Sequence, residues 1–164
     1  MVNPIVKSSI QKLIESAESE GKSGENFSLI KLDDLNKVFR NKLPEWLIQF
    51  YRNVPIYGLE ITTKYTDSED DEDYIDMGFL NIEGIISEAT ELYPGIALLD
   101  KGYLCIGYDT LGTGDQIYIS LDEGENPPVY QIYHDVSEQP DEILSAKRLI
   151  ANSLSELFNN AKVT

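Results

Sequence analysis

The chain has 164 residues, 41% of them hydrophobic and 26% charged, a composition that favours a globular domain over a disordered chain. Its 29 acidic and 13 basic side chains give a net charge of −16, which disfavours binding to nucleic acid or to an anionic membrane. The single cysteine, Cys105, excludes an internal disulfide and a zinc site built from cysteines. The first residues lack the apolar core of a signal peptide, and no stretch has the length of a membrane span, so we expect a cytoplasmic protein.

The acidic residues are concentrated in one part of the chain. Residues 65–146 hold 20 acids and one base, Lys101, for a net charge of −19. Residues 1–64 have nine bases and eight acids, and residues 147–164 have three bases and one acid, so both flanks are slightly positive. Such a field attracts cations, and we therefore expect a partner with a basic surface. The alternative is that the acidity only keeps the protein in solution.

The predicted elements begin with a helix from Asn3 to about Glu20. Asn3 is a good N-cap residue, and Pro4 suits the first helical position. Apolar residues then recur at helical spacing until a polar segment ends the pattern. A short helix is predicted over residues 33–39, capped by one of its aspartates.

The next helix is predicted to run from Pro44 to about Val54. Trp46 and Phe50 lie four residues apart on its apolar side, so we expect both rings in the core. Residues 57–65 are rich in β-branched and aromatic residues and predict a strand, followed by an exposed acidic loop over 66–73.

The rest of the chain predicts a mostly antiparallel sheet closed by a helix. The expected elements are a strand at 75–80, a helix at 81–93, strands at 95–100, 103–109, 116–121 and 129–135, and a helix at 141–158. The fold class is therefore α+β: an antiparallel β meander with helices packed on one face, N-terminal helices and a C-terminal closing helix. A single domain is expected over residues 1–164.

The stretch GYDTLGTGDQIYIS (107–120) contains glycines in a pattern that invites a comparison with phosphate-binding loops. A dinucleotide-binding loop needs a helix directly after its glycines, whereas here Gly112 and Gly114 are followed by Asp115 and a predicted strand. The aspartate would also repel a phosphate. The two glycines instead predict positive backbone φ angles in a turn between antiparallel strands.

We expect no catalytic residue, metal site or cofactor. His134 is the only histidine, and no spaced group of histidine and carboxylate ligands is apparent in the sequence. Cys105 lies in the middle of a predicted strand, where cysteines usually pack inertly. The acidic run lacks the glycine and terminal glutamate of a helix–loop–helix calcium site. A small carboxylate-dependent hydrolase is the enzymatic alternative, but nothing singles out a pair of acids.

Five segments together resemble the SUKH superfamily, which includes yeast cell-wall-assembly regulators and bacterial immunity proteins. In chain order they are LPEWLIQF (43–50), IALLDKGYLCIGYD (96–109), GTGDQIYISL (112–121), PPVYQIYHD (127–135) and IANSLSELF (150–158). The resemblance covers about residues 40–158. The chain departs from the family at 54–58, where Val-Pro-Ile-Tyr-Gly replaces a common Asn-Gly-Gly turn.

The resemblance implies a non-enzymatic immunity protein that binds and neutralises a cognate polymorphic toxin domain. Many such toxins are nucleases, and a nuclease presents cations to its substrate phosphates, so an acidic surface is able to cover that face. The alternative is a regulatory scaffold in cell-wall or signalling assemblies, as in the eukaryotic relatives.

The expected partner-binding residues are acids of the 66–73 loop, acids at strand ends, and two tyrosines predicted to point outward. Because the ends of neighbouring strands lie close together in a meander, several of them are expected to share one patch. They are Glu69, Asp70, Asp71, Asp73, Asp100, Tyr103, Asp109, Asp115, Tyr118, Asp122 and Glu123.

Overall fold

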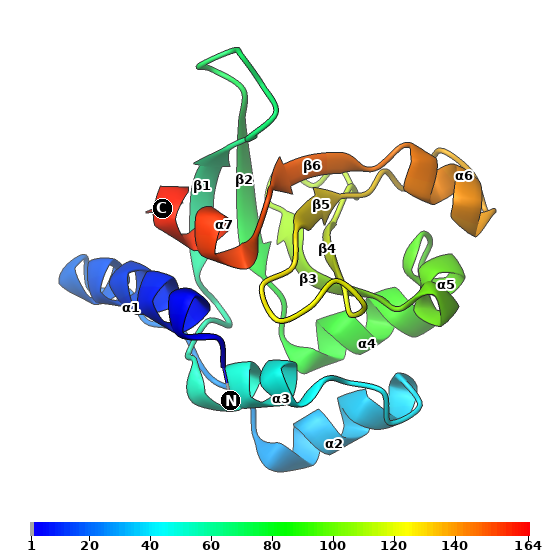
Figure 1. Cartoon of the computed structure of the whole chain (residues 1–164), viewed down its shortest axis with the longest axis horizontal. Helices are drawn as coiled ribbons and strands as arrows, with labels where there is room; N and C mark the ends of the chain where they lie inside the picture. Colours follow the sequence, from blue (N-terminus) through cyan, green and yellow to red (C-terminus); the bar gives the residue numbers. More distant parts are fainter. Residues whose placement is uncertain (1) are drawn as a thin grey trace.

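The computed structural model describes residues 2–164. Its central feature is an antiparallel sheet of seven strands (Figure 1). The strand order across the sheet is β6-β5-β4-β3-β2-β1-β7. The expected α+β class is therefore confirmed. The strands are β1 (Glu60–Lys64), β2 (Tyr74–Phe79), β3 (Tyr103–Asp109), β4 (Ile117–Ser120), β5 (Val129–Gln131), β6 (Arg148–Ala151) and β7 (Lys162–Val163).

Helices precede the first strand along the chain and lie between later strands. They are α1 (Pro4–Ser19), α2 (Leu29–Val38), α3 (Glu45–Asn53), α4 (Ile82–Thr90), α5 (Gly95–Leu98), the 3₁₀ turn η1 (Leu99–Lys101), α6 (Pro140–Ser145) and α7 (Leu154–Asn160). None of these helices is long and apolar enough to cross a membrane.

Several local predictions are confirmed by the backbone and cap geometry. The Asn3 side chain accepts a hydrogen bond from the Ile5 amide at 2.9 Å, and Pro4 opens α1. Gly112 and Gly114 have φ angles of 76° and 83°, which left-handed turn positions require. Helix α2 is longer than predicted, because Ser28 rather than an aspartate caps it.

Two predicted elements are wrong. Residues 95–100 form α5 and η1 instead of a strand, because Gly95 packs directly against the last turn of α4; a Cβ there would lie 1.8 Å from the Glu88 carbonyl oxygen. The predicted helix 141–158 is divided into α6, β6 and α7, since Arg148–Ala151 pair with β5.

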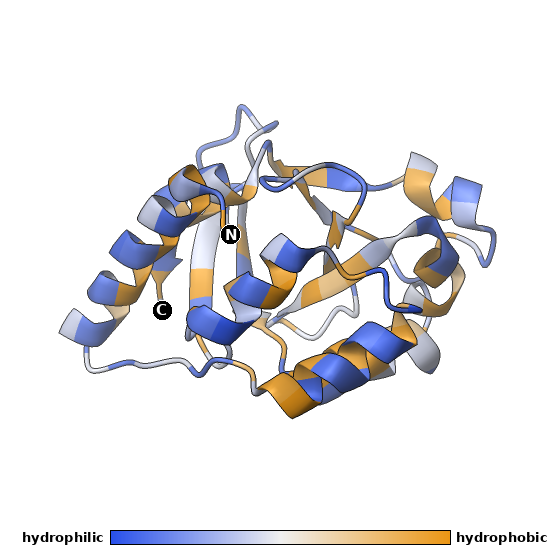
Figure 2. Cartoon of the chain, turned by 60° about the horizontal axis from the view of Figure 1, so that its bottom comes forward, coloured by the Kyte–Doolittle hydropathy of each residue, from blue (hydrophilic) through white to orange (hydrophobic). Residues whose placement is uncertain are grey.

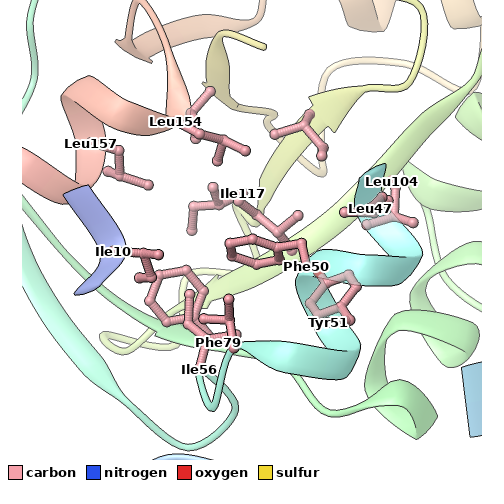
Figure 3. Close-up of a cluster of buried hydrophobic side chains, with 14 of the residues drawn as sticks. Ile10, Leu47, Phe50, Tyr51, Ile56, Phe79, Leu104, Ile117, Leu154 and Leu157 are labelled. Carbon is pink, nitrogen blue, oxygen red and sulfur yellow. The ribbon is translucent and has the colours of Figure 1, made fainter. Parts of the chain in front are cut away.

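The main core lies between the sheet and the helices α1, α3 and α7 (Figure 3). Trp46 and Phe50 are both 4% exposed, so their expected core position is confirmed. Figure 2 shows hydrophobic and hydrophilic residues alternating along the helices, as expected when each helix buries one side.

A second, smaller core covers the opposite face of β3 and β4. It consists of Leu98 from α5, Ile143 from α6, and Cys105, Tyr118 and Ile132 from the sheet region. The central strands are therefore buried on both faces.

The sheet curls so that the end of β1 approaches β6. The Thr66 amide donates a hydrogen bond to the Ile150 carbonyl at 2.9 Å. The Tyr65 hydroxyl donates to Gln131 Oε1 at 2.5 Å, which joins the ends of β1 and β5. The curl brings β6 next to β1 and β2 (Figure 1), and Arg148 of β6 reaches the acidic loop between them.

Candidate partner-binding surface

The predicted partner-binding residues divide between two opposite edges of the sheet. Strand register places the β1–β2 loop and the β3–β4 turn at one edge, since Met77 lies opposite Asp109. It places η1 and the end of β4 at the other, since Tyr103 lies opposite Ser120. We call the first the loop edge (residues 66–73, 109–115 and 134–135) and the second the cavity edge (residues 99–103 and 121–123). The acids thus form two separated groups rather than one patch.

Basic side chains neutralise half of the acids in the 66–73 loop. Arg148 pairs with Asp73 at 2.5 Å and with Asp67 at 3.8 Å, and its guanidinium lies over the Tyr65 ring. Lys64 pairs with Asp71 at 2.9 Å. The hydrogen bond from Arg148 lowers the pKa of Asp73.

The acids of this loop that make no ion pair within residues 2–164 are fewer than the sequence suggests. They are Glu69, Asp70 and Glu72. Asp71 and Asp73, both predicted to face the partner, are engaged with bases of the protein itself.

The remaining two predicted acids of the loop edge build the β3–β4 turn. Asp109 is 8% exposed, and its carboxylate accepts hydrogen bonds from the Leu111 amide at 2.8 Å and the Thr113 hydroxyl at 2.6 Å. Asp115 accepts from both the backbone amide and the ring of His134. Asp109 therefore holds the turn. A substitution there would change the stability of the fold, so a loss of binding could not be assigned to a lost contact with the partner.

The grouping of Asp115, His134 and Asp135 was not predicted from the sequence, because Asp115 and His134 are 19 residues apart in the chain. Their possible ligand atoms lie within 4.8 Å of one another, and this is the one such metal-compatible group within residues 2–164. The three side chains lie toward the surface, and Nδ1 of His134 is already 2.7 Å from Asp115 Oδ1. The arrangement is that of a histidine–carboxylate pair that fixes the strand end.

We expect the pKa of His134 to lie above its ordinary value of 6.5, because the hydrogen bond to Asp115 favours the protonated ring. A pKa that is raised on folding stabilises the fold below pH 6.5, and this contribution is lost as the pH rises through the folded-state pKa. An NMR titration of the ring measures this pKa directly.

Asp115→Asn should lower the pKa of His134, and Asp135→Asn should lower it less, because Asp135 acts only through its charge. A pKa that Asp115→Asn leaves unchanged would contradict the pairing.

The expectation that Tyr118 points outward is wrong. Its side chain is 1% exposed in the second core, because this part of the sheet is covered on both faces. Its hydroxyl is the one buried side-chain polar atom without a hydrogen-bond partner in the described chain. Tyr118 and Cys105 are both buried, and this burial raises the pKa of each side chain.

Tyr103 is half-buried at the cavity edge and belongs to an aromatic pair. Its ring centroid lies 6.4 Å from that of Tyr130, and the Lys147 ammonium lies over both rings. The Tyr130 hydroxyl donates to the Glu123 carboxylate at 3.1 Å. Tyr130 and Lys147 were not predicted as site residues, because the pairing of β5 with β6 that brings them together involves a segment that was predicted to be helical.

The cavity edge also borders a cavity of about 170 Å³ beneath the turn that joins α2 to α3. Asp100 and Asp122 line it from the sheet side, and Arg40 and Lys42 from the turn. Arg40 pairs with Asp100 at 2.9 Å, with both side chains largely exposed. Asp122 and Glu123 are exposed and make no ion pair within the described residues.

The structure is thus an α+β domain that carries acids at two edges of a curled sheet. The model of the SMI1/KNR4 family (SUKH-1) matches residues 27–160. The chain therefore belongs to the SMI1/KNR4 (SUKH-1) family, which confirms the expected superfamily. The match includes α2 and leaves out α1. A comparison with curated proteins found no match.

Proposed function

We propose that the protein is a non-enzymatic immunity protein of the cytoplasm that binds and neutralises a cognate polymorphic toxin domain, a nuclease with a basic surface. Membership of the SMI1/KNR4 (SUKH-1) family supports a role in binding another protein. We also infer that residues 1–164 act as one domain.

The observation that carries the proposal is the distribution of charge. Residues 65–146 have 20 acids and one base. They supply strands β2 to β5 and both the loop edge and the cavity edge. At the cavity edge, Asp122 and Glu123 are followed by exposed Glu125, so three exposed acids lie within four residues. A nuclease must concentrate cations where it binds phosphates, and a surface of this kind complements that face.

The test is co-expression with a candidate toxin domain taken from the genes next to this one. The toxin domain alone should stop growth, and co-expression should restore growth and yield a complex that co-purifies. A catalytically inactive toxin domain then allows the association rate to be measured over a range of salt concentrations. The rate should fall as the salt concentration rises, because charges at the interface act mainly on association.

Failure of the folded proteins to associate would reject the immunity role. If the protein instead bound defined components of a cell-wall assembly, the scaffold role would replace it.

A further inference from the structure

The cavity at the cavity edge has an apolar floor and charged walls. Phe39 lies on the side of α2, and Leu99 and Leu121 lie on the side of the sheet. Asp100 and Asp122 also line the cavity, and the Asp100 carboxylate pairs with Arg40. Such a cavity suits a ligand with an apolar stem and a charged end.

The turn above the cavity has a strained backbone. Arg40 and Asn41 have φ angles of 57° and 60°, a left-handed conformation that costs free energy for residues other than glycine. Two hydrogen bonds to Asn36 hold the turn: its carbonyl accepts from the Asn41 amide at 2.7 Å, and its side chain accepts from the Leu43 amide at 3.1 Å. Strain that is held in this way is concentrated at binding sites.

The charges around the cavity are not all satisfied. Arg40 and Asp100 form an ion pair, whereas Asp122 and Lys42 make none within residues 2–164. Gly102 has a φ of 76°, and a Cβ on it would lie 3.2 Å from Asp122 Oδ2, so the glycine leaves room for this carboxylate. The surrounding segment, with 20 acids and one base, adds a negative field that favours a cation in the cavity.

We infer that this cavity receives a lysine or arginine side chain of the partner, whose cationic end meets Asp122 while its aliphatic stem packs on Phe39, Leu99 and Leu121. The inference rests on the proposed function, because it assigns a contact to the same basic partner. Lys42 opposes the incoming cation and is exposed, so it is free to move aside.

The test is a titration of the isolated protein with Nα-acetyl-arginine amide. NMR shifts of the backbone amides report where the probe binds. Shifts are expected at residues 99–102 and 121–122. Asp122→Asn should weaken binding about tenfold, the loss of one charge-assisted hydrogen bond. Lys42→Met should strengthen binding, because it removes a like charge. Glu69→Gln is the matched control: it removes the same charge at the loop edge and should have little effect.

Equal effects of Asp122→Asn and Glu69→Gln, or the absence of shifts at these residues up to the solubility limit of the probe, would overturn the inference. The inference would also be overturned if the protein bound Nα-acetyl-glutamate amide more tightly than the arginine probe and Lys42→Met abolished that binding, because the cavity would then select an anion. This inference and the immunity role can fail separately. If Asp122→Asn leaves the affinity for the toxin domain unchanged, the cavity contact is rejected and the immunity role is retained.

Discussion

Phe158→Ala should lower the free energy of unfolding by about 3–5 kcal/mol, the range for large aromatic residues removed from a core. Phe158 is 2% exposed, and its ring lies 6.1 Å from that of Phe50 and 6.3 Å from that of Phe79, measured between centroids. It therefore joins α7 to both α3 and β2. Urea denaturation followed by circular dichroism measures the change.

Asn159→Ala is the matched control, because its side chain is exposed on the same helix. We expect it to change stability by less than about 0.5 kcal/mol. A loss of less than about 1 kcal/mol for Phe158→Ala would show that the contacts of α7 contribute little to the core.

The second large effect is expected at the cavity edge. The double variant Asp122→Lys/Glu123→Lys should weaken binding of the toxin domain by about 100-fold or more, since placing like charges in an interface costs several kcal/mol. Calorimetry with a catalytically inactive toxin domain measures the affinity, and survival on co-expression measures protection. Asp109 and Asp115 are unsuitable for this purpose, because they hold the β3–β4 turn.

Glu69→Lys/Asp70→Lys provides the control, because it makes the same change in net charge at the loop edge. Its effect should be less than about fivefold at physiological salt, where distant charges are largely screened. A larger loss in this control than in the cavity-edge variant would move the interface to the loop edge. Equal losses would indicate that only the net charge of the protein matters.

Features determined by neighbouring residues could be predicted from the sequence. The cap at Asn3, the proline that opens α1 and the glycine turn all depend on contacts within a few residues. The core positions of Trp46 and Phe50 follow from helical spacing alone.

Features that depend on distant strands could not be predicted. The apolar residues of 141–158 fit a helix, but Leu149 pairs with Tyr130 in the sheet, and this pairing prevails. A local signal was nevertheless present: Ser153 accepts a hydrogen bond from the Glu156 amide, and the Ser-x-x-Glu pattern is typical of a helix N-terminus.

The candidate site also depends on contacts between residues that are distant in the sequence. The alternation of β4 predicted one exposed face, which placed Tyr118 at the surface, but α5 and α6 supply a second cover. Which acids are neutralised depends on Arg148, which lies 75 residues from Asp73 in the chain.

The position of β7 beside β1 has a consequence for the order in which the protein becomes functional. Residues 61–62 pair with residues 162–163, and the Thr66 amide donates a hydrogen bond to Ile150. In both cases the partner is synthesised long after β1. A ribosome adds about 5–20 residues per second, so these contacts form only several seconds after β1 has been made. Until then β1 has an unpaired edge, which is prone to association with other chains. We therefore expect the nascent chain to gain its binding activity in a single late step, when the segment from β6 to β7 has left the ribosome.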